Sequence, residues 1–287
     1  MITKNQIEVK ILNAFVDNNK GGNPAGVVLN ADQYTTQQKQ KIACLIGLSE
    51  TAFVSSSSIA DFKLDFFTPT RQIAHCGHAT IAVFSHLKQI GLIKNKNSSK
   101  ETIDGIRKII IEDDLAFMEQ SEPKYQDLSK EDELLVIQSI GTDKEIVRNI
   151  KIVNTGNSFA IIHVDDINLL QTNFTQIQHI SEKYDLIGYY VFALKNEDDR
   201  IATTRMFAPR YGIQEEAATG MAAGPLACFL YDILKIERQN YLIEQGWFMQ
   251  KPSKSLLTVE LQIENDKIQS LMVGGKGILM ETKIISL

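Results

Sequence analysis

Short strand-like and helix-like patterns of apolar residues follow one another along the chain. Residues 7–15 and 52–55 predict strands, and the amphipathic pattern of residues 37–48 between them predicts a helix. Near the end of the chain, alternating apolar and polar positions over residues 268–274 and 277–284 predict two more strands. Strands and helices mixed along the whole length favour a fold that contains both.

The clearest local pattern runs from Asp65 to Leu87. A short strand is stopped by Thr68-Pro69, and an apolar helical pattern begins after Cys76-Gly77-His78-Ala79-Thr80. A glycine at the start of a helix lets a ligand approach the backbone, and the first N–H groups point outward at the positive end of the helix dipole. The pattern therefore predicts either a tight strand-to-helix connection or an anion-binding helix start.

The same order of elements recurs from Arg205 to Asp232. An aromatic strand ends at Ala208-Pro209, and Thr219-Gly220-Met221-Ala222 leads into a second apolar helix. Because Gly77 and Gly220 are separated by about half of the chain's 287 residues, we interpret the sequence as two copies of one unit. Two such units facing each other would direct two helix N-termini into one cleft.

The composition argues against several classes of protein. A net charge of −5 disfavours a nucleic-acid partner, because the phosphate backbone is bound through clustered Lys and Arg. Three cysteines without a CxxC pair favour neither a disulfide framework nor a zinc site. The N-terminal residues lack the apolar segment of a signal peptide, and no apolar run reaches the ~18 residues of a membrane span. We therefore expect a cytoplasmic protein without a membrane partner.

Two kinds of chemistry are considered for the polar residues near the first glycine-opened helix. His75, His78 and His86 are candidate metal ligands, but beyond Cys76 no carboxylate or cysteine accompanies them at a suitable spacing, so we predict no metal. Glu50 lies between a predicted helix and a predicted strand, where apolar neighbours would suit its carboxylate to proton transfer. A glutamate at such a junction is, by itself, more often a solvated loop residue.

Several short motifs, in order from residue 13 to about 250, resemble the PhzF-like isomerases named for phenazine biosynthesis. The matching stretches are Asn13-Ala14-Phe15 with Gly22-Asn23-Pro24-Ala25, Leu48 to Val54, Cys76 to Thr80, Phe207-Ala208-Pro209 with Gly212 to Gly220, and Gln245-Gly246. The resemblance implies a diaminopimelate-epimerase-like fold and an isomerase that needs no cofactor. It also implies that Glu50 is the general acid/base and that His78 contacts the substrate and helps to move protons.

The resemblance assigns further residues, with departures from the family pattern that include Arg71-Gln72, where members often carry an acidic residue. Glu216 stands where the family usually has an Asp, and Met221 replaces a small hydroxyl residue, so the substrate need not be the phenazine precursor. The expected catalytic residues are Glu50, His78 and Glu216. The expected substrate-binding residues are Asn23, Cys76, Gly77, Ala79, Thr219, Gly220 and Met221.

We therefore expect an α+β protein of two pseudo-twofold-related halves, each a curled, mostly antiparallel sheet around a central helix. The first half is assigned to residues 1–122 and the second to residues 123–276, and by the resemblance the final strand, residues 277–287, crosses back to the first half. The expected function is cofactor-independent isomerisation or epimerisation of a small carboxylate in the cleft between the halves, with a homodimer as the implied assembly.

Two alternatives stay open. One is an amino-acid racemase, although the two-thiol form of that reaction is disfavoured because Thr219 stands where a partner for Cys76 is needed and Cys228 lies more than two turns into the second helix. The other is a protein that binds small carboxylates without turnover, which the replacements Glu216 and Met221 would permit.

Overall fold

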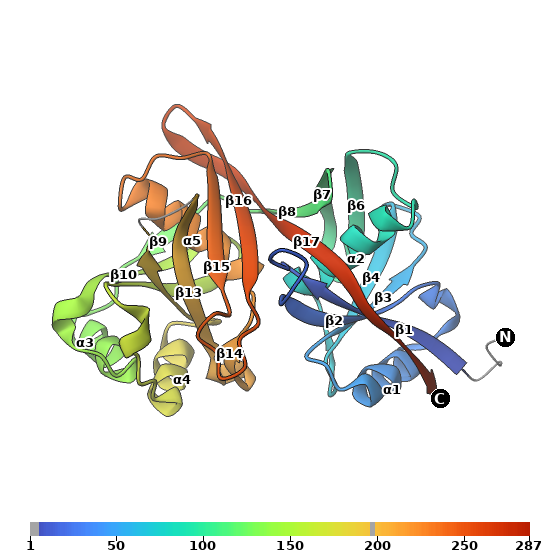
Figure 1. Ribbon diagram of the computed structural model, residues 1–287, viewed down its shortest axis with the longest axis horizontal. Coiled ribbons are helices and arrows are strands. Elements are labelled where there is room, and N and C mark those ends of the chain that lie inside the picture. The colour runs from blue at the N-terminus through green and yellow to red at the C-terminus, as the bar shows by residue number, and fades with distance from the viewer. Residues whose placement is uncertain (1–5, 196–198) are drawn as a thin grey trace. The chain divides into compact units, whose positions relative to one another are not determined.

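The structure is a computed structural model that describes residues 6–195 and 199–287 (Figure 1). The chain divides into two compact units. Unit 1 comprises Met1–Glu119 together with Gly274–Leu287, and unit 2 comprises Gln120–Val273. Within the described residues, no helix has the length and apolar character needed to cross a membrane.

Unit 1 is built on a mostly antiparallel sheet. β1 pairs antiparallel with β2, β2 parallel with β3, β3 antiparallel with β4, β4 parallel with β6, and β6 antiparallel with β7. The C-terminal part of β17 runs antiparallel along β1, as the red and blue arrows of Figure 1 show. The strands are β1 (Gln6–Ala14), β2 (Asn23–Val28), β3 (Thr51–Ser55), β4 (Phe62–Phe67), β5 (Gln72–Ile73), β6 (Asn97–Thr102), β7 (Gly105–Glu112), β8 (Leu115–Gln120) and β17 (Lys267–Ser286).

The sheet of unit 1 surrounds one helix, α2 (Gly77–Gln89). Every residue of α2 from Gly77 to Leu87 is buried, as expected for a helix that is apolar on all sides. The other helix of the unit, α1 (Thr36–Ile46), begins with a capping box formed by Thr35 and Gln38 and leaves most of its side chains at the surface. α2 is therefore the central element of unit 1.

Unit 2 pairs its strands in the same order. β10 pairs antiparallel with β11, β11 parallel with β12, β12 antiparallel with β13, β13 parallel with β15, and β15 antiparallel with β16. The strands are β9 (Lys124–Gln126), β10 (Val147–Asn154), β11 (Ser158–Val164), β12 (Gly188–Leu194), β13 (Arg200–Ala208), β14 (Ile213–Glu216), β15 (Asn240–Gln245) and β16 (Ser255–Glu264).

The central helix of unit 2 is α5 (Gly220–Asp232), which is buried from Ala222 to Leu230. α3 (Lys130–Ser139) and α4 (Phe174–Lys183) pack on the outside of the same unit, where Ile177 and Ile180 of α4 join a core with Tyr189 and Phe207. Four short 3-10 helices complete the chain: η1 (Ala31–Gln33), η2 (Lys144–Ile146), η3 (Ile167–Leu169) and η4 (Pro209–Tyr211).

These observations confirm the predicted α+β class and the predicted pattern of a curled, mostly antiparallel sheet around a central helix in each half. Each unit also has its own hydrophobic core. In unit 1 this core includes Val9, Ile42 and Phe53, and in unit 2 it includes Val136 and Ile162. Each such fully buried side chain contributes roughly 1.5–3 kcal/mol to stability.

The structure differs from the sequence pattern in two places. Residues 94–107 form a polar stretch without a clear strand pattern, but they contain β6. The two strands predicted over residues 268–274 and 277–284 are one strand, β17. Gly277 does not interrupt β17, because its missing side chain lets the strand approach α2: a Cβ there would lie 2.9 Å from Ser85 Cβ, and Gly277 N donates to Ser85 Oγ at 3.0 Å.

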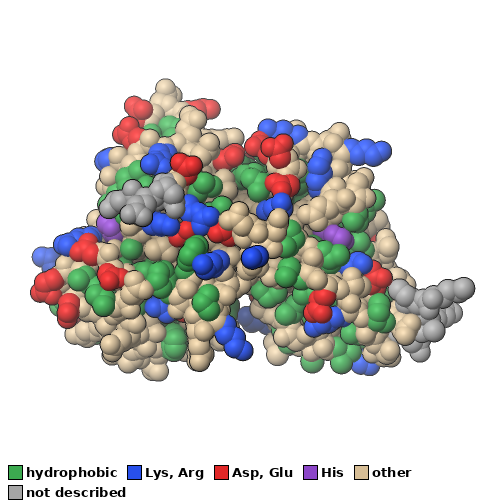
Figure 2. Space-filling model, viewed as in Figure 1, with side chains coloured by type: hydrophobic (Ala, Val, Ile, Leu, Met, Phe, Trp, Pro, Cys, Tyr) green, Lys and Arg blue, Asp and Glu red, His purple; other side chains and the backbone are tan. Residues whose placement is uncertain are grey.

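The surface carries both signs of charge. On the face shown in Figure 2, Lys and Arg side chains are interspersed with Asp and Glu side chains.

Candidate active site

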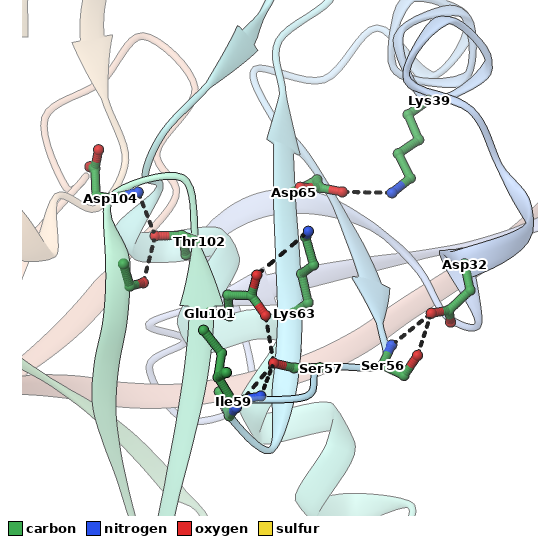
Figure 3. Close-up of polar contacts among 12 residues, drawn as sticks. Asp32, Lys39, Ser56, Ser57, Ile59, Lys63, Asp65, Glu101, Thr102 and Asp104 are labelled. Carbon is green, nitrogen blue, oxygen red and sulfur yellow. Dashed lines mark hydrogen bonds and ion pairs between the residues drawn. The ribbon is translucent and has the colours of Figure 1, made fainter.

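Glu50 is held at the start of β3 by its neighbours on α1 and β2. Lys39 of α1 forms a buried ion pair with Asp65 of β4, with 2.6 Å between Lys39 Nζ and Asp65 Oδ2, which fixes the helix that precedes Glu50 (Figure 3). The helix ends at Gly47, whose positive φ of 68° turns the chain toward Glu50. The carbonyl of Glu50 accepts a hydrogen bond from Gly26 N of β2 at 3.0 Å.

The loop after Glu50 and β3 is also anchored by polar contacts. Ser56 N and Ser56 Oγ both donate to Asp32 Oδ1, at 3.0 and 2.5 Å, and Ser57 Oγ donates to Glu101 Oε2 at 2.5 Å (Figure 3). The backbone of β3, which carries Glu50 at its start, is thus held at both ends.

Cys76 and His78 lie at the start of α2. Cys76 is the N-cap residue, and its side chain makes no capping hydrogen bond to the helix. Its carbonyl instead accepts from Thr80 N at 3.2 Å and Thr80 Oγ1 at 2.6 Å, which fixes the loop that carries the thiol. Gly77, His78 and Ala79 form the first turn of the helix, as the sequence predicts.

The fold brings Glu50, Cys76 and His78 into one cluster, which we call the unit 1 cluster. Glu50 Oε2 lies 3.3 Å from His78 Nε2, and Cys76 Sγ lies 3.6 Å from His78 Nδ1. One donor atom from each of the three residues lies within 4.8 Å of the other two. The side chains of His78 and Glu50 are only 6% and 15% exposed, so a carboxylate, a thiol and an imidazole meet with little water around them.

Lys100 of β6 lies behind this cluster and is fully buried. Its Nζ donates to Thr80 Oγ1 at 2.6 Å, lies 3.3 Å from His75 Nδ1, and stands over the ring of Phe66 at 5.2 Å. Burial lowers the pKa of the Lys100 amine to about 7, although the negative charge of Cys76 acts in the opposite direction.

The pKa of His75 lies far below the value near 6.5 of an ordinary histidine. Burial, followed by the positive charge of Lys100, lowers the pKa of His75 to about 3, so the imidazole is neutral.

Sequence reasoning missed Lys100, because it overlooked β6. The signal was present in the alternation of that strand, where Ser98, Lys100 and Thr102 are the inward positions.

A second cluster, which we call the unit 2 cluster, lies at the start of α5. Thr219 is the N-cap residue and makes no side-chain cap, as Cys76 makes none in unit 1. Thr219 Oγ1 instead donates to Glu216 Oε2 at 2.5 Å, so the glutamate that replaces the family's aspartate is tied to the helix start.

Gln245, the last residue of β15, organises the unit 2 cluster. It is fully buried, and its Nε2 donates to Glu216 O at 2.8 Å and to Thr219 Oγ1 at 3.0 Å. Its Oε1 accepts from Thr219 N and from Tyr190 Oη, both at 3.0 Å. All four hydrogen-bonding positions of the amide are used, so the loop from Glu216 to Thr219 is held by one side chain. The sequence marks Gln245 only as part of a family motif.

The remaining predicted residues are placed as follows. Gly220 begins α5, and its carbonyl accepts from Gln120 Nε2 at 2.9 Å. Met221 Sδ lies 3.4 Å from Asn157 Nδ2. Asn23 is buried at the start of β2, opposite Ala14 of β1. That the helix starts at Gly77 and Gly220 face one cleft stays a prediction, because it depends on the placement of the two units.

A two-thiol mechanism gains no support from unit 2. Cys228 is buried in the middle of α5, and burial raises the pKa of its thiol far above the ordinary range, so it does not form the thiolate that a racemase base requires. The only thiol near a predicted catalytic residue among the described positions is that of Cys76.

The sequence and the fold are similar to those of proteins named as isomerases. A family model described as "Phenazine biosynthesis-like protein" matches residues 12–283. An uncharacterized isomerase of Clostridium acetobutylicum is 31% identical, with 94% of each chain covered, and the uncharacterized isomerase YddE of Escherichia coli K12 is 29% identical, with 95% of this chain and 96% of the relative covered.

Among solved structures, the Bacillus anthracis phenazine biosynthesis protein of the PhzF family has a TM-score of 0.86 and 25% identity, with 98% of this chain and 99% of that chain covered. A hydroxyproline epimerase from Agrobacterium vitis, with bound trans-4-hydroxy-L-proline, has a TM-score of 0.60 and 14% identity over 100% of this chain and 94% of that chain, and so shares the fold.

Proposed function

The chain belongs to the family of phenazine biosynthesis-like proteins, as its motifs predict, and on this premise we propose that it is an isomerase that moves a proton on a small carboxylate without a cofactor. The coarser part of this statement, an isomerase or epimerase, is supported by the names of the relatives and by the epimerase fold. The substrate class and the roles of the residues are our proposal.

One observation carries the proposal: the carboxylate of Glu50 lies 3.3 Å from the imidazole of His78 at the open end of a buried helix. Abstraction of a proton from carbon requires a base held at a fixed position with little competing water, and a group that receives or returns that proton nearby. The side chain of Glu50 is 15% exposed, and its Oε2, the atom nearest His78, is buried, so little water competes at the base.

In the proposed mechanism, Glu50 removes a proton from the carbon next to the substrate's carboxylate or from an allylic carbon. The electron pair left behind delocalises onto the neighbouring unsaturated group, where negative charge develops. The N–H groups of Gly77, His78 and Ala79 at the positive end of α2 are suited to stabilise that charge. The proton then returns to a different carbon, or to the opposite face of the same carbon, from Glu50 or through His78.

Unit 2 is proposed to contribute to substrate binding through its own helix start. The backbone of Gly220 and Met221 begins α5 without a side-chain cap at Thr219, which is the arrangement that receives a carboxylate at a helix N-terminus. Glu216 is held by Thr219 Oγ1 and is proposed to bind a polar or cationic group of the ligand or to assist proton transfer. Met221 makes this helix start less polar than a hydroxyl residue would, which favours a ligand other than the phenazine precursor. A homodimer in the cytoplasm stays part of the proposal.

The proposal is tested by exchange of carbon-bound hydrogen with solvent. The protein is incubated in D2O, in a chelator-treated buffer, with a panel of 2-amino acids and β,γ-unsaturated carboxylic acids that includes trans-4-hydroxy-L-proline, and loss of the C–H signal is followed by proton NMR. We expect exchange with at least one class of ligand in the parent protein and none above background in Glu50→Gln. If a carboxylate raises the melting temperature of the protein but no hydrogen exchanges, the protein only binds the carboxylate and the proposed activity is wrong.

A further inference from the structure

The unit 1 cluster has the geometry of a transition-metal site as well as that of a proton-transfer site. Sequence reasoning predicted no metal because it found no carboxylate near the histidines, but the fold supplies one from Glu50. Tetrahedral Zn²⁺ binds nitrogen and oxygen at about 2.0–2.2 Å and thiolate sulfur at about 2.3 Å, which separates two neighbouring donors by about 3.3–3.6 Å. In the cluster, Glu50 Oε2 lies 3.3 Å from His78 Nε2 and Cys76 Sγ lies 3.6 Å from His78 Nδ1, so the two groups contact opposite nitrogens of one ring.

The imidazole of His78 separates the Glu50 carboxylate from the Cys76 thiol, but one nitrogen of the ring is within reach of both groups. One donor atom from each residue lies within 4.8 Å of the other two. A metal ion bound to one nitrogen of His78 therefore requires the more distant of Glu50 and Cys76 to move from within 4.8 Å to the ~3.3–3.6 Å that separates two ligands of one ion.

The charges of the cluster favour a divalent cation. A cysteine binds a metal as its thiolate, and that thiolate with the Glu50 carboxylate would carry two negative charges in a largely buried cluster, which a divalent cation balances. Thiolate and imidazole are preferred by Zn²⁺ and Co²⁺ rather than by Mg²⁺ or Ca²⁺, which prefer oxygen ligands alone. Three protein ligands leave a fourth position for water or for a ligand carboxylate.

We propose that Glu50, Cys76 and His78 bind a thiophilic divalent metal ion such as Zn²⁺, and that the bound ion inhibits the protein by occupying its proton-transfer groups. The inhibitory part rests on the proposed function, whereas the binding site stands on the three side chains. With the metal in place, the Glu50 carboxylate has its lone pairs directed at the ion and is no longer a base toward carbon. The inference thus adds a way in which metal supply regulates the same site.

The test uses Co²⁺ alone as a spectroscopic probe of the metal-free protein. Co²⁺ bound by a thiolate gives a ligand-to-metal charge-transfer absorption in the near ultraviolet, which distinguishes Cys76 from oxygen-only sites. We expect one Co²⁺ per chain with this absorption, displacement of the Co²⁺ by Zn²⁺, and no binding of Mg²⁺. Cys76→Ser should lose the charge-transfer absorption, and Glu50→Gln and His78→Asn should each weaken Co²⁺ binding by about tenfold or more while the absorption of the residual complex is kept.

Two further variants locate the site. Cys44→Ser is the matched control, because Cys44 is an exposed thiol on α1 outside the cluster, and it should leave the spectrum unchanged. Lys100→Met should tighten Co²⁺ binding, because it removes a buried positive charge that acts on Cys76. Circular dichroism of each variant establishes that it is folded. Charge-transfer absorption that persists in Cys76→Ser, that disappears in Cys44→Ser, or that never develops in the parent protein overturns the proposed site.

The metal site and the proposed function fail separately. Hydrogen exchange in chelator-treated buffer that Zn²⁺ does not suppress leaves the isomerase in place and overturns the inhibitory role. Stoichiometric Co²⁺ binding that requires Cys76, in a protein that exchanges hydrogen on no ligand, overturns the isomerase and leaves the metal site in place.

Discussion

Units 1 and 2 pair their strands in the same order, but they hold the starts of their central helices in different ways. In unit 1 the strand that follows the helix supplies Lys100, a buried amine that reaches Thr80 and, through its hydroxyl, the carbonyl of Cys76. In unit 2 the corresponding strand supplies Gln245, a neutral amide. Its Oε1 accepts a hydrogen bond from Thr219 N, and its Nε2 donates to the backbone carbonyl of Glu216.

The groups that these two supports position also differ. Unit 1 places a carboxylate, a thiol and an imidazole within 4.8 Å of one another, whereas unit 2 ties the carboxylate of Glu216 to the hydroxyl of Thr219. Gly188 begins β12 where Thr51, just after Glu50, begins β3, so no counterpart of Glu50 stands at the start of that strand. The comparison teaches that one strand-pairing scheme can carry a reactive cluster in one unit and a binding helix start in the other.

The largest expected effect separates the two units by chemistry. Glu50→Gln should reduce hydrogen exchange by about 10²–10⁴-fold, the usual contribution of a general acid/base, while ligand affinity stays within about tenfold. Glu216→Gln, the control in unit 2, should reduce exchange far less. NMR exchange rates and thermal-shift titrations measure the two quantities, and equal losses of rate in both variants would contradict the division between the units.

The next effect concerns the amide that supports unit 2. Gln245→Leu leaves the buried Thr219 N and the part-buried carbonyl of Glu216 without the partner that Gln245 supplies, and Tyr190 Oη loses its acceptor but keeps the hydrogen bond from Thr204 Oγ1. Each unpaired buried group costs about 1–3 kcal/mol, so the free energy of unfolding should fall by roughly 3 kcal/mol or more. Urea unfolding followed by circular dichroism measures the change. Gln250→Leu, an exposed position after the same strand, is the control and should stay within about 0.5 kcal/mol of the parent.

A smaller effect is expected at the helix start of unit 2. Gly220→Val places a branched side chain where the backbone is proposed to receive the ligand, and should weaken binding of a small carboxylate by about tenfold or more. Met221→Ser keeps the backbone open and adds a hydroxyl, so it should change affinity by less, and a hydroxylated ligand should bind more tightly. If Gly220→Val binds as well as the parent in a thermal-shift titration, the ligand is held by side chains of the loop from Glu215 to Thr219 instead.

The smallest effect is a change in the free energy of unfolding with pH, which tests the role of Lys100 in unit 1. The pKa of Lys100 is lowered from 10.5 to about 7 in the fold, so between these values the unfolded chain binds the extra proton and stability rises with pH. The rise should be at most about 1.4 kcal/mol per pH unit from this one group. Lys100→Met should remove this rise of stability with pH. Gln245→Asn in unit 2 is the control, because it adds no charge and should keep the rise. Urea midpoints at pH 7, 8 and 9 that rise equally in the parent and in Lys100→Met would contradict the account of Lys100.

The sequence by itself determined the local elements and the two helix starts. Thr68-Pro69 and Ala208-Pro209 stop strands, and Gly77 and Gly220 begin apolar helices, because backbone conformation and side-chain period at these positions are set within a few residues. The motifs around these glycines, taken together with those from residue 13 to about 250, were therefore sufficient to predict the family and the class of fold.

Only the tertiary structure decided which side chains meet. Glu50 and His78 are 28 residues apart in the chain and come within 3.3 Å because β3 and α2 pack in one unit, a contact that no local periodicity encodes. Lys100 was hidden in a polar segment because a buried amine looks like a surface residue until its partner Thr80 is known. β17 continues through Gly277 for the same reason: the glycine is required by the close approach of α2, and a contact between distant segments overrides the local tendency of glycine to end a strand.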